Sequence, residues 1–246
     1  MIDPQTLSLF QDAVADPRFP IAIGIAALSG LVRGFSGFGS ALIYMPLIAA
    51  VYSPRLAAPT LLLIDTICSL PFALHAMPQC NWREVTPVTI GGVVTLPIGV
   101  LALLWVDPLS LRWFIAGLVL AALVALAAGW RYHGRPTLAA SFGVGALAGL
   151  LVFWLGGTNN AVTVRANIMV YFIMQGALSM VMYFFSGLFS AQAIILSLLL
   201  GLPFAVAMAG GAYWFHGSSD ALYRRAAYLI IALAALVSLP VFDALR

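Results

Sequence analysis

Long apolar segments separated by short polar loops occupy almost the whole chain, and this pattern constrains the fold more than any other feature. The apolar segments cover residues 20–33, 37–51, 56–77, 85–106, 109–130, 137–157, 165–186, 190–215 and 222–242. Charged residues make up only 8% of the chain and hydrophobic residues 63%, whereas soluble domains are about 25% charged. A spanning helix needs about 20 apolar residues, so the chain has room for about eight to ten of them. We therefore predict an all-α, polytopic transmembrane helical bundle.

The same composition excludes several classes of protein. Loops this short leave no room for a separate soluble catalytic domain or a nucleic-acid-binding module, so we expect the lipid bilayer and no nucleic acid as a partner. The basic residues are arginines, scattered singly or in pairs beside apolar segments, which is typical of orientation signals. Cys68 and Cys80 form no CxxC motif and no Cys/His cluster. We therefore expect no disulfide framework, no metal and no cofactor.

Residues 1–19 precede the first apolar segment and form either a polar lead-in or a short interfacial helix. Asp3, Asp12 and Asp16 are acidic where the start of a signal peptide is cationic. We therefore do not expect a signal peptide here.

The rest of the chain divides into two weakly similar halves, a first transmembrane repeat at 20–133 and a second at 134–246 within one membrane domain. Arg55 heads a long apolar segment in the first half, and Arg165 does so in the second. If the first apolar stretch is a broken pair, the first half has an odd number of segments and the second half is inverted. Duplicated hydropathy of this kind is typical of secondary transporters, although any two helical hairpins look somewhat alike.

Glycines crowd the segment at 29–47, where an uninterrupted membrane helix would be expected. Glycine inside a helix costs about 1 kcal/mol relative to alanine, so the run predicts a break near residues 34–40. A helix that restarts after Gly39 presents free N–H groups and the positive end of its dipole to an anion. The candidate substrate-binding residues here are Ser36, Gly37, Gly39 and Ser40. Gly30 and Gly34 instead have the spacing of close helix packing, which is the alternative for the whole run.

Two charged residues lie inside apolar segments, where a charge is costly and marks function or a pair. Arg33 directly precedes the predicted break, and an arginine beside a helix N-terminus favours an oxyanion with bidentate geometry, such as sulfite, sulfonate or carboxylate. The alternative is that its side chain extends to the membrane interface. Asp65 lies well inside an apolar segment. We predict that it is either a proton-coupling carboxylate or the ion-pair partner of an arginine such as Arg33.

A second concentration of polar residues lies in GTNNAVTVRAN at 157–167, where one apolar segment gives way to the next. The candidate substrate-binding residues here are Asn159, Asn160, Arg165 and Asn167. The alternative is an ordinary loop with asparagine caps and an interfacial arginine. If both halves contribute, the substrate binds near mid-membrane between them.

The run RGFSGFGSALIYMPL at 33–47, together with VRANIMVYF at 164–172, resembles the TauE/SafE sulfite exporter family, also called the 4-toluene sulfonate uptake family. The likeness covers nearly the whole chain. The resemblance implies a helical membrane transporter of two related halves that moves sulfite, organosulfonates or other small organic anions. It also implies a multi-pass protein of the bacterial inner (cell) membrane.

One region departs from the family pattern. Members of the family show a Gly/Pro-rich break in both halves, but here Gly145–Gly149 continues directly into LLVFWLGG at 150–157. Either the second pair of half-helices has been lost, or residues are missing between Gly149 and Phe153. We favour the second explanation, because losing half of a two-fold site should abolish transport.

These features together predict a secondary transporter of small anions that works by alternating access and is not an enzyme. Protons and sodium are the candidate coupling ions, and a homodimer is the candidate assembly. One alternative is an anion channel. The other is an intramembrane serine hydrolase, because GFSG at 34–37 matches a GxSG motif with Ser36 as nucleophile and His216 as base, although no acid or oxyanion partner accompanies them.

Overall fold

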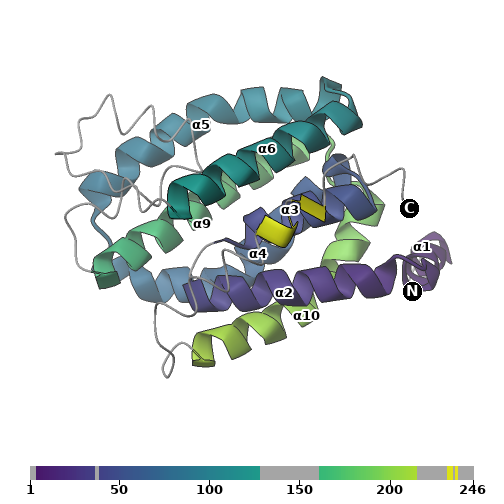
Figure 1. Ribbon diagram of the computed structural model, residues 1–246, viewed down its shortest axis with the longest axis horizontal. Coiled ribbons are helices and arrows are strands. Elements are labelled where there is room, and N and C mark those ends of the chain that lie inside the picture. Colours follow the sequence, from purple (N-terminus) through teal and green to yellow (C-terminus); the bar gives the residue numbers. More distant parts are fainter. Residues whose placement is uncertain (1–3, 37–38, 128–160, 215–231, 235, 238–246) are drawn as a thin grey trace.

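A computed structural model of the protein describes residues 4–36, 39–127, 161–214, 232–234 and 236–237. These residues form helices and no strand, so the predicted all-α bundle is confirmed for this part of the chain (Figure 1). The helices are α1 (Pro4–Ala15), α2 (Phe19–Ser36), α3 (Ser40–Val51), α4 (Pro54–Ala76), the short 3-10 helix η1 (Met77–Gln79), α5 (Trp82–Trp105), α6 (Pro108–Ala127), α9 (Ala161–Phe185) and α10 (Ala191–Trp214). The predicted segment at 137–157, most of the one at 222–242 and the question of missing residues after Gly149 lie outside the described residues.

Four of these helices are long and apolar enough to cross a membrane, namely α4 with η1, α5, α9 and α10. The bent pair of α1 and α2 is a fifth candidate, while α3 and α6 are shorter apolar helices. Large apolar side chains cover their outward faces, among them Ile98, Phe185 and Leu202. Soluble monomers rarely expose large apolar patches, whereas lipid tails are the natural surroundings for them. The chain is therefore an integral membrane protein.

Helices α2 and α10 lie side by side although one comes early and the other late in the chain (Figure 1). A Cβ atom added at Gly30 would lie 2.3 Å from the carbonyl oxygen of Phe204, and one at Gly34 would lie 1.8 Å from that of Met208. The two backbones can approach this closely only because both positions lack a side chain. The packing role predicted for Gly30 and Gly34 is confirmed.

Helix α4 packs against α3, α9 and α10, and α9 also packs against α5. The largest apolar cluster joins α2, α3, α4 and α10, and its buried members include Ile25, Tyr44, Ile64, Leu200 and Phe204. Helices from the second half of the chain are thus packed directly against those of the first. The inverted relation of the two halves, and the domain boundaries at 20–133 and 134–246, stay predictions.

Arg55, at the start of α4, holds the end of α5. Its Nε donates to the carbonyl oxygen of Leu103 at 3.1 Å, and a terminal guanidinium nitrogen donates to that of Leu104. The last carbonyl groups of a helix have no partner within the helix and carry its negative dipole end. The arginine therefore satisfies these groups and fixes α4 against α5.

The N-terminal lead-in contains α1, which is bent by 82° from α2. At the bend Arg18 forms an ion pair with Asp16 at 2.8 Å, and its guanidinium also lies 4.8 Å from the ring centre of Tyr52. The arginine holds the pKa of the Asp16 carboxyl below its ordinary value, chiefly through their side-chain hydrogen bonds. A helix that turns nearly perpendicular to its neighbour can lie along the membrane surface. Of the two alternatives for residues 1–19, α1 therefore fits the short interfacial helix, but its position in the interface stays a prediction.

Candidate functional site

The first apolar stretch is broken where the sequence predicts. Helix α2 ends at Ser36, and α3 begins at Ser40. Gly39 precedes the first turn of α3 with φ at 94°, a conformation that glycine adopts without strain and other residues rarely adopt. The break thus depends on a glycine at 39, and it places the start of α3 beside the end of α2.

Arg33 lies in the last turn of α2, and its side chain points into the protein. The residue is 4% exposed, so it does not extend to the membrane interface. Its Nε lies 3.0 Å from Oδ1 of Asp65, and the same Nε donates to the Ser69 hydroxyl at 3.2 Å. Arg33 and Asp65 therefore form an ion pair, which is one of the two roles predicted for this carboxylate, and a role of Asp65 in proton coupling stays a prediction.

Asp65 is also bonded from the other side of the break. The Ser40 hydroxyl, at the first position of α3, donates to the same Oδ1 at 3.0 Å. One carboxylate oxygen therefore joins the end of α2, the start of α3 and the middle of α4. Breaking a buried ion pair by removing one partner costs about 3–5 kcal/mol, so this contact also holds the broken helix in place.

The site lies near the centre of α4. Asp65 is the middle residue of Pro54–Ala76, so about 16 Å of helix lies on either side of it at 1.5 Å per residue. In a hydrocarbon core about 30 Å thick, a spanning α4 carries this carboxylate close to the midplane.

Helix α9 contributes an aromatic face to the arginine. The guanidinium carbon of Arg33 lies 5.2 Å from the ring centre of Phe172, within the range of a cation–π contact. A helix of the second half thus reaches the charge carried by the first half.

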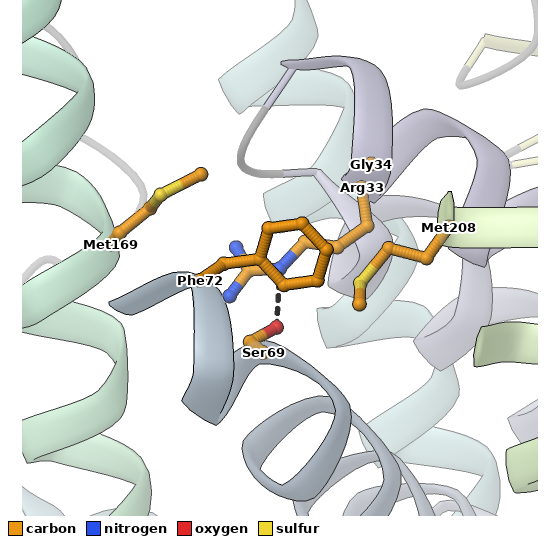
Figure 2. A pocket seen from close by; sticks show the side chains of 6 residues that line it. All are labelled: Arg33, Gly34, Ser69, Phe72, Met169 and Met208. Carbon is orange, nitrogen blue, oxygen red and sulfur yellow. Dashed lines mark hydrogen bonds between the residues drawn. The ribbon is translucent and has the colours of Figure 1, made fainter. Parts of the chain in front are cut away.

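A small pocket opens beside the guanidinium where α2, α4, α9 and α10 meet (Figure 2). Its lining residues are Arg33, Gly34, Ser69, Phe72, Met169 and Met208. Figure 2 shows the guanidinium beside the ring of Phe72, with the Ser69 hydroxyl below it and the two methionines on opposite sides. The pocket measures about 20 Å³, which is room for about one water molecule. It combines one positive charge and one hydroxyl with otherwise apolar walls.

The model of one protein family, described as sulfite exporter TauE/SafE, matches the chain over residues 22–238. The chain belongs to the TauE/SafE sulfite exporter family. Neither the curated proteins nor the solved structures gave a match. Since TauE/SafE proteins are membrane transporters, the family agrees with the apolar helices and with the predicted class of function.

The two TauE/SafE-like segments of the sequence meet at the pocket. Arg33 opens the first of them, at 33–47, and Phe172 ends the second, at 164–172. Met169, also in the second segment, lines the same pocket. One residue of the first segment therefore lies beside two residues of the second, although the segments are far apart in the sequence.

Of the predicted substrate-binding residues, the structure brings Arg33 and Ser40 together around Asp65 and puts Gly39 at the adjacent break. Three others, Gly37, Asn159 and Asn160, lie outside the described residues, and the side chains of Ser36 and Arg165 are not described. Binding of substrate by any of these residues stays a prediction.

Asn167 has a different set of partners. It is fully buried, accepts a hydrogen bond from the backbone N–H of Asn81 at 2.7 Å, and donates to Glu84 Oε2 at 3.0 Å. Asn81 also donates through its side chain to the other carboxylate oxygen of Glu84 at 3.1 Å. These contacts tie α9 to the start of α5. The Asn81 side chain makes no capping bond to the backbone of α5, and the sequence does not show that Asn167 contacts Asn81 and Glu84.

Two further polar side chains of α9 face α5. The Tyr171 hydroxyl and Gln175 Oε1 are buried and have no hydrogen-bond partner among the described residues. Both lie against Gly92, where an added Cβ would be 2.7 Å from Gln175 Oε1 and 3.1 Å from the Tyr171 hydroxyl. A glycine at 92 therefore makes room for polar groups between these helices.

Sequence reasoning missed Ser69 and Phe172 as members of the site. Ser69 is one helical turn after Asp65, so the i, i+4 spacing on one face could have found it. Phe172 could not be found in this way, because its neighbour Arg33 belongs to a distant helix. Within the described part of the chain, no three His, Cys, Asp or Glu residues come together as a metal site would need.

Proposed function

We propose that this protein is a secondary transporter of small anions, with sulfite, organosulfonates and related carboxylates as the substrate class. The observation that carries the proposal is the buried guanidinium of Arg33 beside a pocket where α2, α4, α9 and α10 meet. Arginine presents several N–H donors in a fixed plane, which suits the oxygens of sulfite, sulfonate and carboxylate groups. Membership of the TauE/SafE family supports the same class of substrate.

Alternating access is the mechanism we propose for it. The pocket has room for about one water molecule, so an oxyanion requires it to widen. A carrier closes around its site between openings to the two sides, and the broken helix at Gly39 is the type of element on which carriers build such sites. The apolar lining of Phe72, Met169 and Met208 leaves room for little water, which strengthens the attraction between the guanidinium and an anion.

The other features of the proposal follow from the family and the composition. The protein acts as a carrier without enzymatic activity, in the bacterial inner membrane as a multi-pass protein. Protons or sodium are the coupling ions, and both repeats contribute to the site, the second through Phe172 and Met169.

Counterflow in proteoliposomes tests this proposal. Liposomes loaded with unlabelled sulfite should take up radiolabelled sulfite when they contain the wild-type protein, and a panel of sulfonates and carboxylates should compete. The variant Arg33→Gln/Asp65→Asn removes both charges of the pair together and leaves no unpaired ion. It should insert normally and lose counterflow. Anion current without counterflow would instead indicate a channel, and normal counterflow by the double variant would place the site elsewhere.

A further inference from the structure

The place for an anion beside Arg33 is already taken by a carboxylate of the protein. Arg33 Nε and the Ser40 hydroxyl both lie 3.0 Å from Oδ1 of Asp65. Both residues are almost fully buried, and each is a donor that an oxyanion would use. The carboxylate oxygen thus has the surroundings that a bound substrate oxygen would need.

We propose that Asp65 is the resident anion of this site and that a substrate oxyanion binds Arg33 by replacing it. The inference rests on the proposed function and adds one step to it, in which Asp65 leaves Arg33 when the substrate binds. A carboxylate and a sulfite or sulfonate group carry the same type of charged oxygen, so they compete for the same N–H and O–H donors. Asp65 keeps the charge of Arg33 paired when no substrate is bound, and it lowers the apparent affinity for the anion.

Exchange is geometrically accessible because Asp65 is the less enclosed member of the pair. Its side chain is 19% exposed, whereas that of Arg33 is 4% exposed. The guanidinium is held between the Ser69 hydroxyl and the ring of Phe172. The carboxylate is therefore the group that moves aside, while the arginine keeps its position for the substrate.

The charge balance of the site sets a further requirement. Arg33 and Asp65 together are neutral, so an arriving monoanion leaves one net negative charge, and a dianion two, in a region where unpaired charge is costly. A proton or a sodium ion that joins Asp65 in the loaded state offsets one of these charges. Among the described residues, this carboxylate is faced by Arg33 from α2, Ser40 from α3 and Cys68 from α4. The guanidinium is surrounded by Ser69 of α4, Phe172 of α9 and Met208 of α10.

The exchange is tested by measuring the affinity of purified Asp65→Asn for sulfite. Wild type and Arg33→Gln/Asp65→Asn are measured for comparison. Asparagine keeps the size of the side chain and removes the competing charge, so Asp65→Asn should bind sulfite at least about tenfold more tightly than wild type, which corresponds to roughly 1.4 kcal/mol. The double variant should not bind. Unchanged or weaker binding by folded Asp65→Asn would overturn the inference while leaving transport by the wild type, and so the proposed function, intact. If wild type and Asp65→Asn both fail to bind any anion of the panel, the proposed function fails as well.

A second measurement needs no charge-removing variant and covers the case in which Asp65→Asn does not fold. Infrared difference spectra of wild type labelled with ¹³C-aspartate should show a carboxylate band that shifts when sulfite is added. In Asp65→Glu, which keeps the charge, the shift should disappear from the labelled aspartate bands. An aspartate spectrum that does not respond to saturating sulfite in wild type would overturn the inference.

Discussion

Replacing Gly34 with alanine tests the close approach of α2 and α10 that supports the site. In a helix interior this change normally stabilises by about 1 kcal/mol. Here the new Cβ would lie 1.8 Å from the carbonyl oxygen of Met208. Carbon and oxygen atoms approach to about 3.3 Å even in short contacts, so the helices would have to separate by roughly 1.5 Å.

The same helix offers a matched control. An added Cβ at Gly24 meets no atom within 4 Å, while one at Gly30 would lie 2.3 Å from the carbonyl oxygen of Phe204. Overpacking costs about 1–3 kcal/mol, whereas Gly24→Ala retains the gain in helix propensity. Because both variants gain helix propensity, the difference in unfolding free energy between Gly34→Ala and Gly24→Ala is the overpacking cost of about 1–3 kcal/mol, which corresponds to a melting temperature lower by about 2–12 °C.

Thermal unfolding of the purified proteins in detergent, followed by tryptophan fluorescence, measures this difference. We expect the highest melting temperature for Gly24→Ala, a lower one for Gly30→Ala and the lowest for Gly34→Ala. If the melting temperature of Gly34→Ala equals or exceeds that of Gly24→Ala, the two helices do not approach as closely as described. Gly34 and Met208 then do not form a wall of the pocket.

Three other predictions address the polar contacts of the described helices. Ser40→Ala removes a hydrogen bond to a carboxylate and should destabilise the protein by about 1.5–3 kcal/mol in the same unfolding assay. Ser29→Ala is its control because the Ser29 hydroxyl donates only to a carbonyl of its own helix, and equal losses in the two variants would contradict the role of Ser40. Asn167→Ala takes this partner from the Asn81 N–H and from a Glu84 oxygen and should lower the free energy of unfolding by about 1–3 kcal/mol. An unchanged melting temperature would show that these contacts do not hold α9 to α5. Burial and the charge of Glu84 raise the pKa of the Cys80 thiol. In a variant that lacks the other cysteine, Glu84→Gln should therefore lower this pKa and speed the alkylation of Cys80 by iodoacetamide at pH 8. An equal or slower rate would refute this electrostatic influence.

Local rules account for the features of the site that could be predicted from sequence. Four glycines in a short run predict the break because each weakens the helix by itself, and the structure has the break at Gly39. Arg33 and Asp65 could be paired in advance because the bilayer penalises each charge alone. Such penalties act on individual residues, so they are visible without knowledge of the fold.

Features that depend on helix packing could not be predicted in the same way. The partner of Gly34 is Met208, and that of Arg33 is Phe172, and nothing in the local sequence indicates which distant helix lies opposite. Asn167 shows the same limit: its place in a polar run made it a candidate substrate-binding residue, but its contacts with Asn81 and Glu84 depend on how α9 meets α5.

The most direct test of an anion site at Arg33 is the position of a bound anion. Selenite has the pyramidal shape of sulfite, and its selenium scatters X-rays anomalously, so crystals soaked with selenite would show where it binds. We predict an anomalous peak in a widened pocket between Arg33, Ser69 and Phe172, with the carboxylate of Asp65 moved away from the guanidinium. A peak elsewhere, with Arg33 Nε still 3.0 Å from Asp65 Oδ1, would contradict the assignment.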